Sequence, residues 1–148
     1  MEILNRQAKF NYKILKEIEC GIELVGTEIK SIKKGSAYLK DSYGRIKDNE
    51  VFLLNMFIAK YEQGNIFNHE ERRTRKLLLH KKEILKLKKE LELNNYTLVP
   101  LKLYFVRGKA KILLGLCEGK KLYDKRKSEK EKDQKRNIKN YFWSFLLF

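Results

Sequence analysis

The chain changes composition sharply near residue 119, and this change limits what it can fold into. Residues 1–119 carry short periodic apolar runs, whereas residues 120–148 hold ten Lys and Arg against four Asp and Glu. Between Asp124 and Lys139 the only aliphatic residue is Ile138. A segment that buries so little apolar surface cannot offset the conformational entropy that it loses on ordering. We therefore predict a folded body over 1–119 and a basic C-terminal tail over 120–148 that is disordered when free.

The tail is nevertheless rich in helix-forming residues and contains neither Pro nor Gly. A channel lined by RNA would neutralise the repulsion among its cations, so we expect the tail to become helical in such a channel.

The whole chain of 148 residues has a net charge of +15. Such an excess repels itself in a compact state and predicts a polyanionic partner; a basic protein without a specific partner is the plain alternative. No run approaches the roughly 18 apolar residues that cross a bilayer, and the N-terminus lacks the apolar stretch of a signal peptide. We therefore expect no membrane partner and a cytoplasmic location. Cys20 and Cys117 lie in apolar runs and are predicted to be buried free thiols.

Short apolar runs predict strands over much of the body. The first ten residues are polar and are predicted to be a flexible start. A half-buried strand follows over 12–20, and Gly21 interrupts it. Two more strands, 37–47 and 50–58, are joined by a turn at Asp48-Asn49.

A second hairpin is predicted further along the chain. Its strands cover 97–106 and 109–117 and are joined by Arg107-Gly108, while Pro100 indicates a sheet edge or a bulge. The stretch 75–79 fits either an extended strand or the start of a helix.

Helical signals are fewer and lie between the predicted strands. A short helix is predicted over 27–34, with Thr27 as its N-cap and Gly35 at its left-handed C-terminal position. An amphipathic helix covers 84–91 and ends at Asn94-Asn95. Five or six strands without strand-helix-strand regularity predict a mainly β fold. It is a small antiparallel OB-like barrel with two or three embedded helices and the basic C-terminal tail.

Catalytic signals are weak. His69 stands beside Glu70 and Glu71, which would suit a nuclease, but the arginines that follow make charge balance the favoured explanation. The two His and two Cys residues do not show zinc-ligand spacing, and no glycine-rich phosphate loop is present. We predict a protein that is not an enzyme and uses no cofactor.

The densest basic cluster of the body is Arg72-Arg73-Thr74-Arg75-Lys76. Arginine forks bind phosphate oxygens in pairs, so Arg73, Arg75 and Lys76 are predicted RNA contacts. A solvated charged loop is the alternative. Some of the eight Tyr and eight Phe residues are expected to stack on unpaired bases, although most belong to the core.

Six sequence words occur in the order of one known family. They are Gly26-Thr27-Glu28-Ile29-Lys30-Ser31-Ile32, Leu39-Lys40-Asp41-Ser42-Tyr43, Tyr61-Glu62-Gln63-Gly64-Asn65, Arg73-Thr74-Arg75-Lys76-Leu77-Leu78-Leu79-His80, Val99-Pro100-Leu101-Lys102-Leu103-Tyr104 and Gly119-Lys120-Lys121-Leu122-Tyr123-Asp124-Lys125-Arg126. Across about residues 5–136 the chain resembles the SsrA-binding protein family, also called small protein B.

The resemblance implies an RNA-binding factor of trans-translation. Its partner would be the tRNA-like domain of transfer-messenger RNA, which it delivers to stalled ribosomes, with the body replacing the anticodon arm. The tail would probe the decoding centre and the empty mRNA channel. Further implied partners are the small ribosomal subunit with its 16S rRNA, and elongation factor Tu through the same RNA. From composition alone, the alternative is a non-specific OB-type RNA chaperone or ribosome-associated protein.

The resemblance also implies roles for single residues. Asn5, Glu19, Leu78 and Lys111 match family positions implicated in RNA binding. Gly119, Lys120 and Lys121 belong to the implied decoding-centre and tail site. In the same site Tyr123 matches a position near the decoding centre, and Asp124-Lys125-Arg126 matches the signature required for tagging.

Two departures from the family pattern stand out. Glu70-Glu71 replaces the usual Asp-Pro, and the aromatic end 141–148 replaces a basic or polar ending. A shifted reading frame near the end would explain the second departure.

Overall fold

The computed structural model describes residues 2–63 and 68–119. The predictions for the tail over 120–148 lie outside these residues. Within the described ranges the chain forms nine strands and three helices, in the order β1 (Glu2–Leu4), α1 (Arg6–Asn11), β2 (Tyr12–Ile22), α2 (Gly26–Lys33), β3 (Ala37–Tyr38), β4 (Tyr43–Lys47), β5 (Glu50–Leu54), β6 (Phe57–Ile58), β7 (Arg75–Leu78), α3 (Lys81–Leu93), β8 (Tyr96–Val106) and β9 (Lys109–Gly119).

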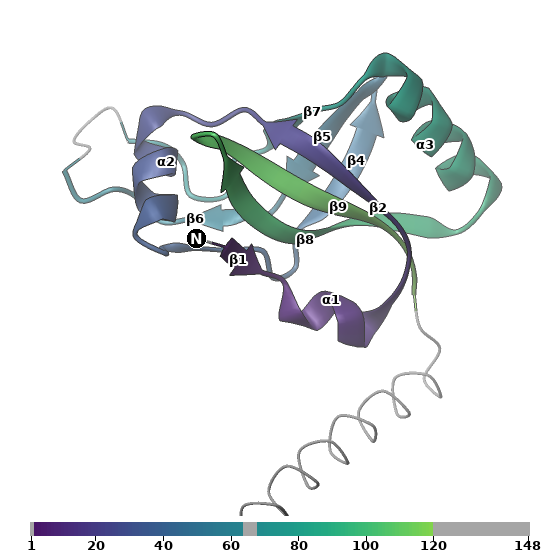
Figure 1. The fold of residues 1–148 in the computed structure, drawn as a ribbon, viewed down its shortest axis with the longest axis horizontal. Coiled ribbons are helices and arrows are strands. Elements are labelled where there is room, and N and C mark those ends of the chain that lie inside the picture. Colours follow the sequence, from purple (N-terminus) through teal and green to yellow (C-terminus); the bar gives the residue numbers. More distant parts are fainter. Residues whose placement is uncertain (1, 64–67, 120–148) are drawn as a thin grey trace, which may run out of the picture.

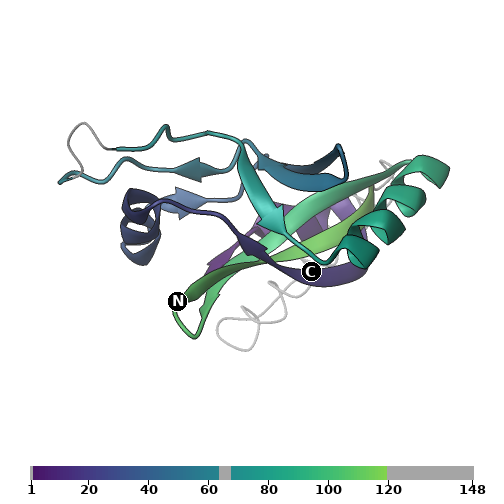
Figure 2. The same ribbon diagram turned by 90° about the horizontal axis from the view of Figure 1, so that it is seen from above.

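Six of the strands close into an antiparallel ring. The hydrogen-bonded order β8-β4-β5-β7-β2-β9 returns to β8, because β8 and β9 also pair, and β1 lies on the edge of β8 beside β4 (Figure 1). Helices α2 and α3 lie at opposite ends of this ring (Figures 1 and 2). The predicted fold class, a mainly β antiparallel barrel with embedded helices, is confirmed.

The ring consists of two halves joined at two short seams. Strands β4, β5 and β7 form one half, and strands β2, β9 and β8 form the other, with long ladders inside it. Between the halves, β2 and β7 share two residue pairs, Gly21↔Leu78 and Ile22↔Leu77, and β4 and β8 share the single pair Gly44↔Leu98. Gly44 is required there, because a Cβ would lie 2.8 Å from the Cβ of Leu98.

Both predicted hairpins form, and each uses a two-residue turn. The central residues have positive φ in both, 51° and 60° at Asp48 and Asn49 and 51° and 79° at Arg107 and Gly108. Turns of this kind match the right-handed twist of the flanking strands. The predicted irregularity at Pro100 is a register shift between Pro100 and Lys102.

The strand count was predicted too low, because two predicted strands each break in two and the N-terminal strand β1 was not predicted. The segment 37–47 divides into β3 and β4 around Asp41, whose φ is 62°, and 50–58 divides into β5 and β6 around Asn55, whose φ is 66°. The short pieces β3 and β6 pair with each other outside the ring. Gly21 does not interrupt β2, which runs on to Ile22, and the stretch 75–79 contains the strand β7 (Arg75–Leu78).

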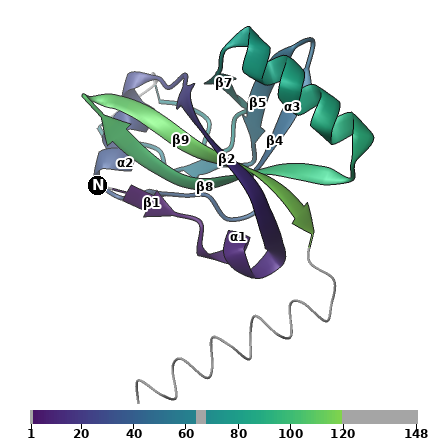
Figure 3. The same cartoon turned by 45° about the vertical axis from the view of Figure 1, so that its right-hand side comes forward.

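The helices confirm the amphipathic prediction and correct one cap. Helix α3 lies at one end of the barrel (Figure 3). It buries Ile84 and Leu87 and ends before Asn94. Helix α2 begins after Val25, whose N–H donates to Glu28 Oε1 at 2.9 Å, so Thr27 is not its N-cap. Gly35 has the predicted positive φ, at 77°.

The prediction of a flexible start is wrong. Strand β1 pairs with β8, with Glu2 opposite Tyr104, and α1 buries Ala8 against Val99 and Cys117. The partners lie about a hundred residues away, so local polarity could not reveal this contact.

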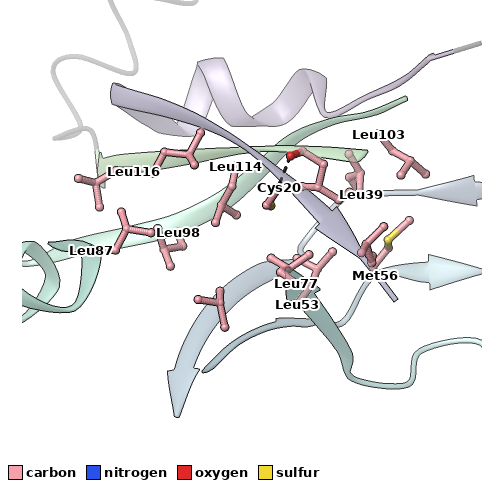
Figure 4. Packing of buried hydrophobic residues seen from close by; sticks show 14 of the residues in the cluster. Cys20, Leu39, Leu53, Met56, Leu77, Leu87, Leu98, Leu103, Leu114 and Leu116 are labelled. Carbon is pink, nitrogen blue, oxygen red and sulfur yellow. Dashed lines mark hydrogen bonds between the residues drawn. The ribbon is translucent and has the colours of Figure 1, made fainter. Parts of the chain in front are cut away.

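The main core fills the barrel with aliphatic side chains from both halves (Figure 4). Both cysteines are buried and free, as predicted. Cys20 Sγ donates to the carbonyl oxygen of Ile112 at 3.4 Å. Burial raises the pKa of Cys20 to about 12 and that of Cys117 to about 11, so both thiols stay protonated at neutral pH. No helix in the described ranges is long and apolar enough to cross a bilayer.

Candidate nucleic-acid interface

A surface groove lies along the seam between β2 and β7. Strand β7 leaves β2 after Leu78, and the chain turns into α3 at Lys81. The space that opens has a volume of about 940 Å³ and is bounded by β2, β7, the start of α3 and the turn between β8 and β9. We call it the β2–β7 groove.

The groove brings together four residues that the sequence predicted as RNA contacts, Glu19, Lys76, Leu78 and Lys111, which all line it. Gly21 accounts for the proximity of Leu78 and Lys111, because it pairs with Leu78 on one side and with Lys111 on the other. Leu78 is 47% exposed and therefore offers an apolar contact beside charged groups.

Glu19 has a partner that sequence reasoning did not single out. Tyr104 lies opposite Lys111 in the β8–β9 ladder, and its hydroxyl donates to Glu19 Oε2 at 2.5 Å. Burial and this hydrogen bond raise the pKa of Tyr104, so the phenol remains a donor at neutral pH. The two-residue turn at Arg107-Gly108 could have identified Tyr104, because it fixes which residue faces Lys111.

Two of the predicted arginine contacts hold the fold together instead of lining the groove. Glu28 is completely buried, and its carboxylate accepts from Nη2 and Nε of Arg73 at 2.5 and 3.1 Å. It also accepts from Arg75 Nε at 2.5 Å. Arg73 keeps 31% of its side chain exposed, which leaves room for a contact with RNA.

Arg75 is a correction to the sequence-based expectation. Its side chain is 0% exposed, and it donates to the carbonyl oxygens of Met56, Arg73 and Glu71 as well as to Glu28. No donor group of this guanidinium faces solvent, so Arg75 belongs to the framework and does not reach a phosphate in this structure.

The buried ion pair has a clear electrostatic signature. Burial alone would raise the pKa of Glu28, but the hydrogen bonds from Arg73, Val25 and Arg75 outweigh it and hold that pKa below its usual value. Burial lowers the pKa of Arg75, and Glu28 opposes this shift. The pair is therefore charged at neutral pH, and it ties α2 to the start of β7.

Asn5 lies away from the β2–β7 groove. It is buried at the start of α1, and its Nδ2 donates to the carbonyl oxygen of Pro100 at 2.8 Å. A smaller pocket of about 230 Å³ adjoins it, lined also by Asn11 and Tyr43. The predicted contact of Asn5 with RNA would therefore lie outside the β2–β7 groove.

His69 is occupied on both ring nitrogens. Its Nε2 lies 2.9 Å from the carbonyl oxygen of Ile58, which can only accept, so Nε2 donates. Nδ1 then accepts from Thr27 Oγ1 at 2.8 Å. The side chain is buried, which leaves no nitrogen for a substrate.

Of the predicted tail residues, only Gly119 is described. It is the last residue of β9 and lies opposite Tyr12. Lys120, Lys121, Tyr123, Asp124, Lys125 and Arg126 lie outside the described residues.

Known proteins resemble this chain closely. The family model described as SmpB protein matches residues 2–143. An SsrA-binding protein of Staphylococcus haemolyticus (strain JCSC1435) is 55% identical over 134 residues, which cover 90% of this chain and 86% of that protein. The SsrA-binding protein of Staphylococcus aureus (strain Newman) is 56% identical over 134 residues, covering 90% of this chain and 87% of its own.

A solved structure shares the fold. It is described as "tmRNA-SmpB: a journey to the center of the bacterial ribosome", and its chain is 48% identical with a TM-score of 0.69. The match covers 82% of this chain and 85% of that one. The family match over 2–143 and these identities lead to one conclusion: this chain belongs to the SmpB protein family.

Proposed function

We propose that this protein is the RNA-binding factor of trans-translation. It binds the tRNA-like domain of transfer-messenger RNA and delivers it to stalled ribosomes. The observation that carries this proposal is the shared fold, at 48% identity, with an SmpB chain whose structure is described with tmRNA and the bacterial ribosome. In this arrangement the body replaces the anticodon arm, and the tail probes the decoding centre and the empty mRNA channel.

The geometry of the body supports an RNA partner. The β2–β7 groove offers Lys76 and Lys111 for phosphates, Glu19 with Tyr104 for base or sugar hydroxyl groups, and Leu78 for apolar contact. The net charge of +15 favours association with a polyanion.

The further partners follow from this role. They are the small ribosomal subunit with its 16S rRNA, and elongation factor Tu through the bound RNA, in the cytoplasm where ribosomes act. The role is binding without catalysis, and the buried, fully hydrogen-bonded ring of His69 argues against the nuclease alternative.

A non-specific RNA chaperone of the OB type is the competing function, and competition separates the two. The full chain is bound to the labelled tRNA-like domain of transfer-messenger RNA, and excess bulk tRNA is added. We expect the complex to persist, because a specific binder discriminates against tRNA by more than its phosphate contacts. Displacement in proportion to the added tRNA would instead support the chaperone.

Single substitutions in the groove test its role. We expect Glu19→Ala and Lys111→Ala each to weaken binding of the tRNA-like domain by about tenfold or more, since each removes a hydrogen bond that involves a charged group. Both side chains lie at the surface of the groove, so the melting temperature should change little. Equilibrium binding and thermal unfolding are measured on the same preparations.

Charge-matched controls come from strand β2. Glu17 and Lys13 are exposed on β2 but do not line the groove, so Glu17→Ala and Lys13→Ala should leave the affinity nearly unchanged. Equal losses from groove and control variants would show that only net charge matters. Unfolding of Glu19→Ala or Lys111→Ala would assign these residues to the fold.

A further inference from the structure

An exposed pair of stacked aromatic rings lies outside the β2–β7 groove. Tyr38 of β3 and Phe57 of β6 stack with ring centroids 4.5 Å apart and an interplanar angle of 20°. Phe57 lies against one face of the Tyr38 ring, and Tyr38 is nevertheless 45% exposed. The short ribbon of β3 and β6 that carries the pair lies near α2, at the end of the barrel opposite α3 (Figures 1 and 2).

Arg72 stands beside this pair without covering it. Its Cζ atom is 5.9 Å from the Tyr38 ring centroid and 5.3 Å from that of Phe57. A guanidinium on the outer face of either ring would be close to one ring and far from the other. The similar distances therefore place the guanidinium at the side of the stack and not on the outer face of Tyr38.

The guanidinium also keeps donors for a ligand. Only Nη1 of Arg72 has acceptors among the described residues, the carbonyl and side-chain oxygens of Asn55, both at 3.4 Å. Nε and Nη2 have none in those ranges, and the residue is exposed. We call Tyr38, Phe57 and Arg72 together the aromatic platform.

The surroundings of the platform are basic. The chain segments that carry the two rings, residues 33–40 and 55–60, contain four lysines and no carboxylate. Close by, Lys30 and Lys34 lie over the ring of Tyr61, at 5.4 and 4.8 Å from its centroid. Along the sequence, Asp41 follows the first of these segments, Glu62 follows the second, and Glu70 and Glu71 precede Arg72.

We propose that the aromatic platform binds an unpaired nucleotide of RNA, with its base stacked on the outer face of Tyr38 and its phosphate held by Arg72. A flat exposed ring suits any nucleobase, and the adjacent guanidinium with free donors suits the phosphate that the base carries. None of the three residues lines the β2–β7 groove, so this is a second RNA contact on the body. It rests on the proposed function only in that the partner is RNA.

The test uses the full chain and a short unstructured RNA oligonucleotide with a central 2-aminopurine, compared with the same oligonucleotide lacking the central base. We expect the wild type to bind the complete oligonucleotide more tightly and to quench the 2-aminopurine. Tyr38→Leu should weaken this binding by about 5- to 150-fold and remove the preference over the abasic probe. Arg72→Gln should weaken binding of both probes, since it removes a phosphate contact.

Leu85→Ala is the control for loss of an exposed apolar side chain. Leu85 of α3 is 43% exposed, close to the 45% of Tyr38, and lines neither of the two pockets. This variant should bind both probes as the wild type does. Thermal unfolding of each variant checks that the exposed substitutions leave the fold intact.

The proposal is overturned if Tyr38→Leu retains the affinity and the quenching of the wild type. It is also overturned if this variant loses affinity for the complete and the abasic oligonucleotide equally, because the ring of Tyr38 would then not hold a base. Neither result tests binding of the tRNA-like domain. Conversely, if the competition with bulk tRNA fails to support the proposed function, the comparison with the abasic oligonucleotide still tests the aromatic platform.

Discussion

Glu28→Gln is expected to lower the free energy of unfolding by about 3–5 kcal/mol, because it leaves Arg75 as a buried charge without a counterion. Both side chains are 0% exposed, and the amide would turn an N–H group toward guanidinium donors. The corresponding fall in melting temperature is about 10–25 °C. Thermal and denaturant unfolding monitored by circular dichroism measure the change.

A surface ion pair offers the matched control. Glu50 binds Lys76 at 3.3 Å with 48% of its side chain exposed, so Glu50→Gln should cost less than about 1 kcal/mol. Similar losses from the two variants would show that burial does not strengthen the role of Glu28.

The ion pair also predicts how stability depends on pH. The folded pKa of Glu28 lies below its usual value, so the stabilisation is complete above the unfolded pKa of about 4.3. It is lost as the pH falls from there through the folded pKa, because the unfolded chain then takes up the proton first. Glu28→Gln should therefore reduce the loss of stability below about pH 4.3. The prediction would be contradicted if this variant lost stability below about pH 4.3 as steeply as the wild type does.

Removal of residues 122–148 should abolish tagging on stalled ribosomes while leaving binding of the tRNA-like domain nearly intact. The barrel closes through β9, and its last residue, Gly119, still pairs with Tyr12 in the truncated chain. The truncation removes eight cations and four carboxylates, so the net charge falls only from +15 to +11. A binding assay and a reconstituted tagging assay on the same protein separate the two functions.

A tail of unchanged composition but shuffled order over 122–139 serves as the control for charge. If the order of Tyr123 and Asp124-Lys125-Arg126 carries the function, the shuffled chain should also fail to support tagging. Loss of RNA binding on truncation would instead place part of the RNA-binding surface beyond Gly119.

Local signals in the sequence were sufficient for the hairpins and for α3. Asp48-Asn49 and Arg107-Gly108 tolerate positive φ, and each stands between alternating strands, so turn and register follow together. The spacing of Ile84 and Leu87 requires a helix with one buried face. The grouping of Glu19, Leu78 and Lys111 came from the family resemblance, and the groove places them together.

Contacts between distant residues were beyond the same reasoning. Arg75 is 47 positions from Glu28, and nothing local distinguishes it from its exposed neighbour Arg72. A cluster of arginines in a sequence predicts an exposed surface. In the fold, however, Arg75 is buried, Arg73 is partly exposed in an ion pair with Glu28, and Arg72 is exposed. The N-terminal strand was missed for the same reason, since its partner lies on β8.

The short seam between β2 and β7 has a consequence for how recognition and folding are linked. Leu78 belongs to one half of the barrel, and Glu19 and Lys111 belong to the other. A ligand that touches all three has affinity only for the closed seam, so its binding free energy is added to the free energy of local opening. A ligand bound in the groove therefore also makes the barrel more resistant to local opening.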